Sequence, residues 1–430
     1  MIKFSPAMTR TTPLPRLLAT TLLAAAAALP PALQAEPDEM ALGKAQGYPV
    51  APSRAQGNQM PYRVGTWSAM DRLPGVRVAP AQRGDAVSPL PRAAAAPEIR
   101  YRHRNVRYTL DDYLERQRIT GLLVVKDGQI LVERYRYGRT EDARFLSFSM
   151  AKSVTALLVG IAQARGVIAS LDDPAAKYVP ALAGSGYGET SVRDLLRMSS
   201  GLTFTERYDG QDDVARLSRS VATGTPPVVE VLRSITDRHS PPGRKFVYAS
   251  SETEVLGRVL AAATGRSLAA LTQEWLWQPL GAERDAFWCT DTAGQESAYY
   301  CFNAALRDWG RLGWMLARDG RVGEREIVPR EYLLDATDAK RQPSAFQPYR
   351  ATPFFGYGYQ FWLHPSAERT FVMQGVHGQS LLVQPSSGIV IVQTAVYAGA
   401  SGALDPDAHA ERSSFWLGVL DSLGGSTRRW

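Results

Sequence analysis

Cysteine, lysine and histidine are scarce in this chain of 430 residues, which contains two, seven and five of them. Two cysteines without a nearby histidine supply too few ligands for a structural zinc site, and the His-Glu-x-x-His motif of many metallohydrolases is absent. A Gly-x-Ser-x-Gly motif is also missing, which argues against an α/β-hydrolase. The sequence therefore predicts neither a metal nor another cofactor.

A membrane bundle does not fit the composition, and the most prominent apolar run lies near the N-terminus. There, residues 17–29 follow three basic residues, and a small residue, Ala35, precedes Glu36. This pattern predicts a secretory signal peptide at residues 1–35, because the apolar stretch is too short and too early for a membrane span. We expect a periplasmic or secreted protein with no stable membrane span after cleavage. An uncleaved signal anchor is the alternative.

Clusters of basic residues that would bind nucleic acid are missing too. The formal net charge of +7 would fall to +4 on cleavage, because residues 1–35 contain three bases and no acids. The other bases are scattered, which is typical of a solvated surface, so we expect no nucleic-acid partner. With 45% hydrophobic and 21% charged residues, the composition is that of a globular enzyme. The oligomeric state stays open.

Residues 36–97 are rich in proline, alanine and glycine, and they show no sustained apolar period outside a short patch at residues 62–70. We interpret them as a loosely ordered N-terminal extension that wraps around the domain or leads into it. Ordered structure is expected to begin near Tyr101, so that residues 98–430 form the functional domain.

The two cysteines, Cys289 and Cys301, are close together in a chain that we expect to be exported. An oxidising compartment favours a disulfide between them. Closing so short a loop would contribute about 2–3 kcal/mol by the chain-entropy estimate. Two free buried thiols are the alternative.

Strand patterns occur near both ends of the predicted domain. Residues 121–126 and 129–135 are strand-like and are joined by Asp127-Gly128, which predicts a hairpin. Residues 150–165 carry apolar side chains three and four apart and stop at Gly166, which predicts a buried helix.

The middle of the domain is mostly helical in pattern, and strands return near its end. Residues 171–334 show no strand-like run of comparable strength, so we expect a helical lobe there. Its clearest predicted helices are residues 191–198, 252–263 and 268–277; the later predicted strands are 371–376, 379–384 and 389–396, followed by a helix at 412–423. One antiparallel sheet built from both ends, with an inserted helical lobe, explains this order.

Ser149 and Lys152 are three residues apart at the start of the first predicted helix. This spacing places both side chains on one face. A serine hydroxyl becomes a good nucleophile when a base accepts its proton, and a lysine whose pKa is lowered by burial can be that base. The helix N-terminus favours developing negative charge. A surface lysine at a helix start is the other interpretation, because Ser-x-x-Lys alone is a weak motif.

Tyr248 and Ser250 lie directly before the predicted helix at residues 252–263. A phenol between a Ser-Lys pair and a substrate could pass a proton to the leaving group, and the Ser250 hydroxyl could orient it. By itself, the Tyr-x-Ser triplet is more simply explained as a loop-to-helix junction with a serine cap.

Gly375 and Gly378 flank His377 between two predicted strands. Paired glycines let the backbone approach a ligand, and a backbone N–H there could form an oxyanion hole with the N–H of Ser149. His377 could hydrogen-bond a substrate, although a histidine at a strand end is more often structural.

These three motifs occur in a chain whose order of elements is hairpin, Ser149 helix, helical lobe and final sheet. Motifs and order together resemble those of the class C β-lactamases, DD-peptidases and related esterases. Tyr-x-Ser stands where β-lactamases usually have Tyr-x-Asn. Over roughly residues 60–425, the chain is most similar to the 6-aminohexanoate-dimer hydrolase branch. The segments that carry this resemblance are Leu146-Ser-Phe-Ser-Met-Ala-Lys-Ser-Val154, Arg193-Asp-Leu-Leu-Arg-Met198, Gly356-Tyr-Gly-Tyr-Gln-Phe-Trp362 and Val376-His-Gly-Gln379.

The resemblance implies an α/β fold of the α+β type, as in β-lactamases and transpeptidases, with a five-stranded antiparallel sheet flanked by helices and a helical lobe. It implies acyl transfer through an ester on Ser149, with Lys152 as base and Tyr248 as proton shuttle. The remaining residues carried over are Ser250 as a supporting hydroxyl, Val376 as the second oxyanion N–H, and Tyr208 as a substrate-covering tyrosine.

One departure from the family bears on the substrate. Where penicillin binders have Lys-Thr-Gly, this chain has Gln374-Gly375 and His377-Gly378, with no fixed cation. The carboxylate of a β-lactam or of D-Ala-D-Ala is therefore a less natural ligand. We expect a small-molecule amide or ester as substrate. β-Lactamase or DD-peptidase activity, or a non-catalytic penicillin-binding-like module, are the alternatives.

Overall fold

The largest sheet is built from strands at both ends of the described chain. The computed structural model describes residues 39–430, so the predicted signal peptide lies outside the described residues. Seven antiparallel strands follow in the order β11-β12-β13-β14-β15-β4-β5. Their bounds are β4 (Ile119–Lys126), β5 (Gln129–Tyr135), β11 (Gly356–Tyr357), β12 (Trp362–Leu363), β13 (Phe371–Gly375), β14 (Gln379–Gln384) and β15 (Ile389–Ala395).

This sheet confirms the predicted antiparallel architecture and corrects the number of strands. We expected five strands, and the sheet has seven because β11 and β12 extend it beyond β13. Each of these two strands has only two residues. Such a segment is too short to show the period-two alternation by which a strand is detected in a sequence.

Strands β4 and β5 form the predicted hairpin. Asp127 and Gly128 both have positive φ, 50° and 76°, as a two-residue type I′ turn requires. On its other side, β4 pairs with β15, from Ile389 opposite Lys126 onwards. The early hairpin is thereby joined to the late strands.

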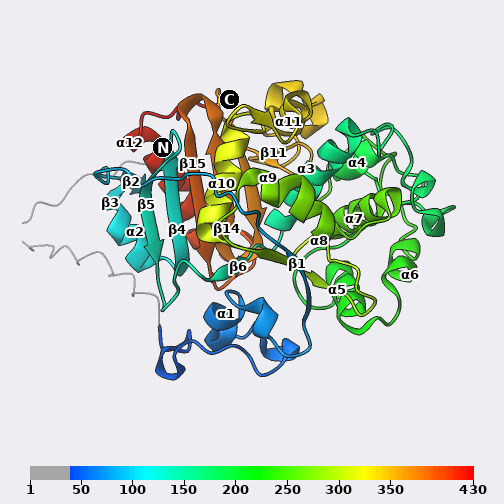
Figure 1. Cartoon of the computed structure of the whole chain (residues 1–430), viewed down its shortest axis with the longest axis horizontal. Coiled ribbons are helices and arrows are strands. Elements are labelled where there is room, and N and C mark those ends of the chain that lie inside the picture. The colour runs from blue at the N-terminus through cyan, green and yellow to red at the C-terminus, as the bar shows by residue number, and fades with distance from the viewer. Residues whose placement is uncertain (1–38) are drawn as a thin grey trace, which may run out of the picture. The chain divides into compact units, whose positions relative to one another are not determined.

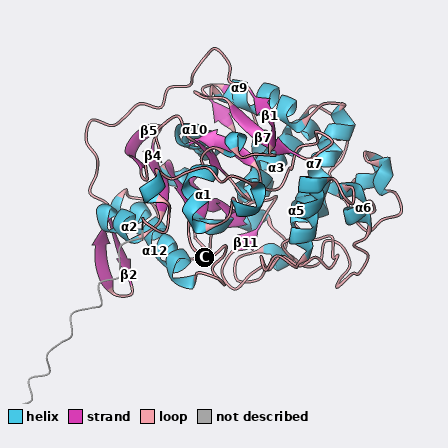
Figure 2. Cartoon of the chain, turned by 90° about the horizontal axis from the view of Figure 1, so that it is seen from below, coloured by secondary structure: helices cyan, strands magenta, loops and turns pink. Residues whose placement is uncertain are grey.

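Helices cover both faces of this sheet. Helices α3 (Met150–Ala164) and α10 (Leu306–Ala317) share one hydrophobic core with it. Helices α2 (Leu110–Arg116) and α12 (Pro406–Ser422) share a second core with it. Figure 2 shows α10 and α12 on opposite sides of β4 and β5. The helix predicted after Ser149 is thus confirmed, and the predicted C-terminal helix begins earlier than expected.

The pleat of β4 explains the two cores. Leu123 and Val125 are buried in the core that contains α3 and α10, whereas Leu122 and Val124 are buried in the core that contains α12. Successive side chains of a strand point to opposite faces. A strand covered on both faces therefore has the continuous apolar sequence seen here.

Much of residues 171–334 forms the predicted helical lobe, which Figure 1 shows in green to one side of the large sheet. The helices outside the sheet layers are α4 (Val192–Leu196), α5 (Asp213–Thr223), α6 (Val228–Arg233), α7 (Ser250–Thr264), α8 (Leu268–Leu271), the π-helical segment Thr272–Trp277, α9 (Gln278–Leu280) and α11 (Arg330–Thr337). Within residues 39–430, no helix combines the length and the apolar character needed to cross a membrane.

A second sheet contributes two strands to the stretch that we expected to be mostly helical, without a strong strand-like run. It has four strands in the order β1-β7-β8-β6. Its members are β1 (Arg77–Ala81), β6 (Arg144–Leu146), β7 (Ala286–Thr290) and β8 (Phe302–Ala305), and two-stranded sheets pair β2 (Arg100–His103) with β3 (Val106–Thr109) and β9 (Arg321–Val322) with β10 (Arg325–Glu326). All five residues of β7 are buried, so its sequence lacks the alternation of a half-exposed strand.

The predicted disulfide joins Cys289 and Cys301. Cys289 lies on β7, and Cys301 directly precedes β8, which pairs with β7. The bridge therefore fastens two neighbouring strands of the second sheet, and the prediction is confirmed.

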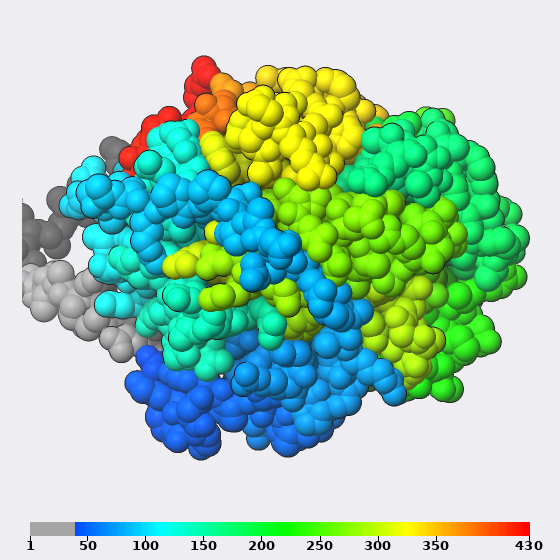
Figure 3. Space-filling view, in the orientation of Figure 1, coloured from blue at the N-terminus to red at the C-terminus, as the bar shows by residue number. Residues whose placement is uncertain are grey.

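The expectation of a loosely ordered N-terminal extension is wrong for the described residues 39–97. This segment contains α1 (Met60–Thr66) and pairs β1 with β7. Its Trp67 and Met70 belong to a hydrophobic core with Phe287 of β7. Figure 3 shows the segment in blue across the visible face of the protein. Its apolar residues are too sparse to give a local period, and they are buried only by partners far along the chain.

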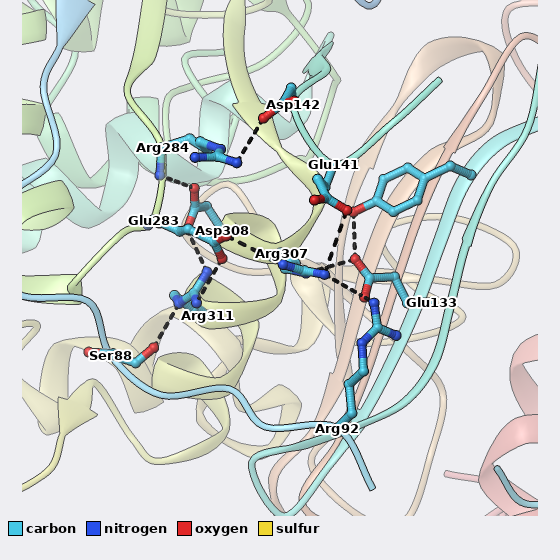
Figure 4. Close-up of polar contacts among 11 residues, drawn as sticks. Ser88, Arg92, Glu133, Glu141, Asp142, Glu283, Arg284, Arg307, Asp308 and Arg311 are labelled. Atoms are coloured by element: carbon cyan, nitrogen blue, oxygen red, sulfur yellow. Dashed lines mark hydrogen bonds and ion pairs between the residues drawn. The ribbon is translucent and has the colours of Figure 1, made fainter. Parts of the chain in front are cut away.

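A network of charged side chains attaches the extension to the large sheet (Figure 4). The Glu133 side chain on β5 is only 1% exposed and pairs with Arg92 of the extension and with Arg307 of α10, whose Nε lies 2.8 Å from the carboxylate. One turn further along α10, the Arg311 Nε donates to the backbone oxygen of Ser88 at 2.9 Å. Glu133 is the point at which the extension, the sheet and α10 meet.

Replacing Glu133 by alanine is expected to lower the free energy of unfolding by about 2–4 kcal/mol, because the buried carboxylate accepts hydrogen bonds from Arg307 and Tyr135 that the variant cannot form. Guanidinium denaturation measures the change. Glu141→Ala is the matched control, since Glu141 is 53% exposed and lies 3.9 Å from Arg307; it should cost less than about 1 kcal/mol. Equal losses in the two variants would contradict a special role for Glu133.

Candidate active site

Ser149 stands at the start of α3, and its hydroxyl contacts the side chain of Lys152. The Lys152 Nζ donates to Ser149 Oγ at 2.9 Å and to the backbone oxygen of Tyr299 at 2.9 Å. The first contact follows from helix periodicity, because residues three apart lie on one face. Only 1% of Lys152 is exposed, so its amine is shielded from water, whereas Ser149 is partly exposed and lines a cavity.

Burial changes the protonation of Lys152. Removing an ammonium group from water disfavours its charged form, and this lowers the pKa of Lys152 to about 8, although the nearby Glu206 carboxylate opposes the shift. An appreciable fraction of the amine is then unprotonated near neutral pH. An unprotonated amine at hydrogen-bond distance from a serine hydroxyl can accept its proton.

Tyr248 lies beside this pair, just before α7. The Lys152 Nζ is 5.1 Å from the centre of its ring, and the ring stacks on Trp362 at 5.4 Å. Burial, followed by the charge of Glu206, raises the pKa of Tyr248 well above its usual value, although a hydrogen bond with Ser149 opposes this. The phenol therefore stays protonated at neutral pH and can donate its proton.

Glu206 is a charged group of the site that the sequence analysis did not identify. Its carboxylate accepts the Tyr208 hydroxyl at 2.8 Å, and it accepts both the hydroxyl and the backbone N–H of Ser250 at 2.9 Å. Glu206 therefore joins two residues that the sequence predicted for the site. The sequence feature that could have identified Glu206 is its position in the loop that carries Tyr208.

The N-terminal extension contributes an aromatic side chain next to Ser149. The Trp67 ring contacts Phe148 and His377, with ring centroids 4.9 Å apart in each case. Both partners have a left-handed backbone, with φ of 44° and 59°, which is uncommon for residues other than glycine. Phe148 precedes Ser149, and His377 follows Val376. Trp67 thus packs on the two constrained segments that carry Ser149 and Val376.

Val376 and His377 form a turn after β13. Within residues 39–430, the Ser149 N–H makes no backbone hydrogen bond, and Val376 lines the same cavity as Ser149. The His377 Nδ1 lies 2.9 Å from the backbone oxygen of Tyr397. Burial, assisted by the charge of Arg63, lowers the pKa of His377 to about 4. The imidazole is therefore neutral at pH 7 and is held by the backbone.

A cavity of about 660 Å³ brings the predicted site residues together. The predicted residues that line it are Ser149, Tyr208, Ser250, Val376 and His377, and Lys152 and Tyr248 adjoin it through their contacts with Ser149. Sequence reasoning missed the contribution of the extension and of α5, which supply Arg54, Arg63, Trp67 and Arg219. In the described part of the chain, no group of three or more His, Cys, Asp or Glu residues could hold a metal ion.

The fold and this site define a serine hydrolase of the β-lactamase/transpeptidase type. The chain belongs to the Beta-lactamase family, whose sequence profile matches residues 106–412. It is 28% identical over 326 residues to a 6-aminohexanoate-dimer hydrolase of Paenarthrobacter ureafaciens, with 73% of this chain and 81% of that protein covered. It is 24% identical over 184 residues to a β-lactamase of Pseudomonas fluorescens, with 40% and 47% covered.

Solved structures share the fold. A solved structure from Bacillus anthracis that also carries the name 6-aminohexanoate-dimer hydrolase has a TM-score of 0.75 at 21% identity. The alignment covers 87% of this chain and 99% of that chain. A class C β-lactamase from Rhodobacter sphaeroides has a TM-score of 0.52 at 18% identity, with 72% and 97% covered.

Proposed function

We propose that this protein is an exported serine hydrolase that cleaves an amide or ester bond through an acyl-enzyme on Ser149. The observation that carries the proposal is the 2.9 Å contact between Ser149 Oγ and a buried lysine amine, whose pKa is lowered to about 8. A nucleophile and its base are thereby in place before substrate binds.

In the proposed reaction, Lys152 accepts the hydroxyl proton while Ser149 Oγ attacks the substrate carbonyl. The N–H groups of Ser149 and Val376 would stabilise the oxyanion. Tyr248 would donate its proton to the leaving amine or alcohol and recover one from Lys152, so that both groups end in their starting states. Water then attacks the ester on Ser149 by the same steps in reverse order and releases the acid.

The proposed substrate class follows from the charges near the oxyanion turn. Gln374 stands where penicillin binders have a lysine, and its amide oxygen accepts from Arg412 at 2.6 Å. A β-lactam carboxylate would find no lysine there, and Arg412 is only 3% exposed and does not line the cavity, so we favour a linear amide or ester. The relative from Paenarthrobacter ureafaciens, named for the hydrolysis of a linear amide, supports this choice.

We also propose that the mature protein is periplasmic or secreted. The predicted signal peptide at residues 1–35 and the disulfide between Cys289 and Cys301 support an oxidising destination.

A substrate panel tests the function. Purified mature protein is expected to hydrolyse a short-chain nitrophenyl ester and a linear 6-aminohexanoate dimer, and to spare a chromogenic cephalosporin. Intact-mass spectrometry after rapid quenching should show the acyl group, and peptide mapping should place it on Ser149. Turnover of the cephalosporin at the rate of the ester would favour a β-lactamase instead. If no substrate is turned over and no adduct forms, a non-catalytic penicillin-binding-like module is the better interpretation.

A further inference from the structure

None of the three arginines that line the cavity, Arg54, Arg63 and Arg219, has an acidic partner among residues 39–430, and Arg54 and Arg219 each make a hydrogen bond to a single backbone oxygen. Arg54, at the start of the short 3-10 segment Arg54–Gln56 in the extension, donates from Nη1 to the backbone oxygen of Ala222 at 3.2 Å. Arg219, on α5, donates from Nη1 to the backbone oxygen of Gly210 at 3.0 Å. Each guanidinium has five N–H donors, so both have donors to spare for a ligand.

The acidic residues of the cavity are already engaged elsewhere. Glu206 accepts from Tyr208 and Ser250, and Asp212 accepts the backbone N–H groups of Arg207, Tyr208 and Ala215. Neither carboxylate pairs with Arg54 or Arg219. The cavity therefore has negative charge beside the nucleophile and uncompensated positive charge on another wall.

A third cavity arginine, Arg63, is not available in the same way. Its Nη1 contacts the backbone oxygens of Tyr397 and Ala398 at 2.6 and 3.0 Å, and its Nε donates to the backbone oxygen of Asn58 at 2.9 Å. Burial lowers the pKa of Arg63 to about 10. It therefore fastens the extension to the loop that follows β15.

The arginines and the nucleophile are linked by Tyr299 and Tyr300. The backbone oxygen of Tyr299 accepts from Lys152, while its hydroxyl lies 3.1 Å from the hydroxyl of Ser218 on α5. The Tyr300 ring is 5.0 Å from that of Tyr299, and Tyr300 lines the cavity together with Arg54. Tyr299 thus extends from Lys152 to the helix that carries Arg219, and its neighbour Tyr300 belongs to the same cavity lining as Arg54.

We propose that Arg54 and Arg219 form a carboxylate-binding subsite, and that the natural substrate is a linear amide or ester with a free carboxylate at one end. Guanidinium groups bind carboxylates through charge-assisted hydrogen bonds. Glu206 would repel a carboxylate from the part of the cavity next to Ser149. The substrate would therefore bind with its carboxylate at the arginines and its scissile carbonyl at Ser149. This inference rests on the proposed function, and it assigns a role to the extension.

A matched pair of esters tests the subsite. The probes are a nitrophenyl ester of adipic acid with its second carboxyl free and the same ester with that carboxyl methylated. Wild type should prefer the free acid in kcat/KM by about 10-fold to 100-fold, the range expected for a charge-assisted pair. In R54Q/R219Q this ratio should fall to about 1, and Arg54→Lys should retain part of it because the charge remains.

Arg216→Gln is the matched control. Arg216 is also on α5, pairs with Asp213 at 3.5 Å and does not line the cavity, so its loss should leave the ratio unchanged. An equal fall in Arg216→Gln would mean that general positive charge attracts the acid. A wild-type ratio near 1, or a double variant that only unfolds at lower temperature while keeping the ratio, would overturn the subsite.

A binding measurement separates this inference from the proposed function. If wild type turns over neither ester, the proposed function fails, but adipate monomethyl ester can still be titrated by calorimetry into the wild-type protein. The subsite requires saturable binding that weakens at least about 10-fold in R54Q/R219Q. Equal affinity in the two proteins, or no binding to either, would reject it.

Discussion

Replacing Ser149 by alanine is expected to lower kcat/KM for the nitrophenyl ester by at least about 10⁴-fold. The variant lacks the hydroxyl oxygen that lies 2.9 Å from the Lys152 amine, so the ester on residue 149 cannot form. Water attack assisted by the oxyanion N–H groups would account for the residual rate. Steady-state hydrolysis, with intact mass to confirm that no acyl adduct appears, measures the effect.

Ser153→Ala is the matched control for this prediction. Ser153 is on the same helix, one residue after Lys152, and its hydroxyl donates to the backbone oxygen of Gln360 at 2.6 Å. Loss of this hydroxyl removes one buried hydrogen bond and should lower the free energy of unfolding by about 1 kcal/mol. The acyl adduct on Ser149 should remain detectable in this variant. If Ser149→Ala retains wild-type activity while folded, the nucleophile has been assigned to the wrong residue.

The second large effect is expected at Lys152. Wild-type kcat/KM should rise with pH and level off with an apparent pKa of about 8, because only the unprotonated amine accepts the hydroxyl proton. Below that pH the ammonium form dominates and the rate falls tenfold per pH unit. Lys152→Met should lower the plateau rate by about 10²-fold to 10⁴-fold, and the rise of the rate with pH should disappear. Rates measured from about pH 6 to about pH 10 cover both sides of the transition.

Lys152→Arg distinguishes a base from a fixed charge. A guanidinium keeps the positive charge but stays protonated throughout this pH range, so this variant should be as inactive as Lys152→Met. An active arginine variant with a flat pH profile would instead make Lys152 an electrostatic group, and the proton acceptor would have to be sought elsewhere.

The lowered pKa of Lys152 also means that the protonated form of this side chain destabilises the folded protein. Its pKa falls from 10.5 to about 8 on folding, so the folded protein binds fewer protons than the unfolded chain between these two values. Stability therefore rises with pH across that window and is lowest, for this group, below about pH 8.

Some of the site could be inferred because it depends on short-range geometry. Ser149 and Lys152 meet because residues three apart share a helix face, and the hairpin around Asp127 follows from a two-residue turn. Tyr248, Ser250, Val376 and His377 were predicted through the order of motifs along the chain, and the structure brings them to one cavity. Their roles stay predictions until the variants are measured.

Other parts of the site depend on contacts between distant segments. Arg54 and Trp67 lie in a proline-rich and glycine-rich stretch without a period, and they reach the cavity because contacts with distant segments hold the extension in place, among them the pairing of β1 with β7 and the core around Phe287. Glu206 resembles any loop carboxylate until Tyr208 and Ser250 are seen to donate to it. Such contacts leave no local pattern, which is why the extension was wrongly expected to be loosely ordered.

The sequence by itself determined the helix that follows Ser149, the antiparallel character of the sheet, the disulfide partners and the class of chemistry. Each of these depends on spacing within one element or on a choice among very few residues. The tertiary structure alone decided that the sheet has seven strands, that a second sheet crosses the helical lobe, and that the extension walls the cavity. The same holds for the charges around Ser149, because the pKa of Lys152 depends on burial by segments more than a hundred residues away.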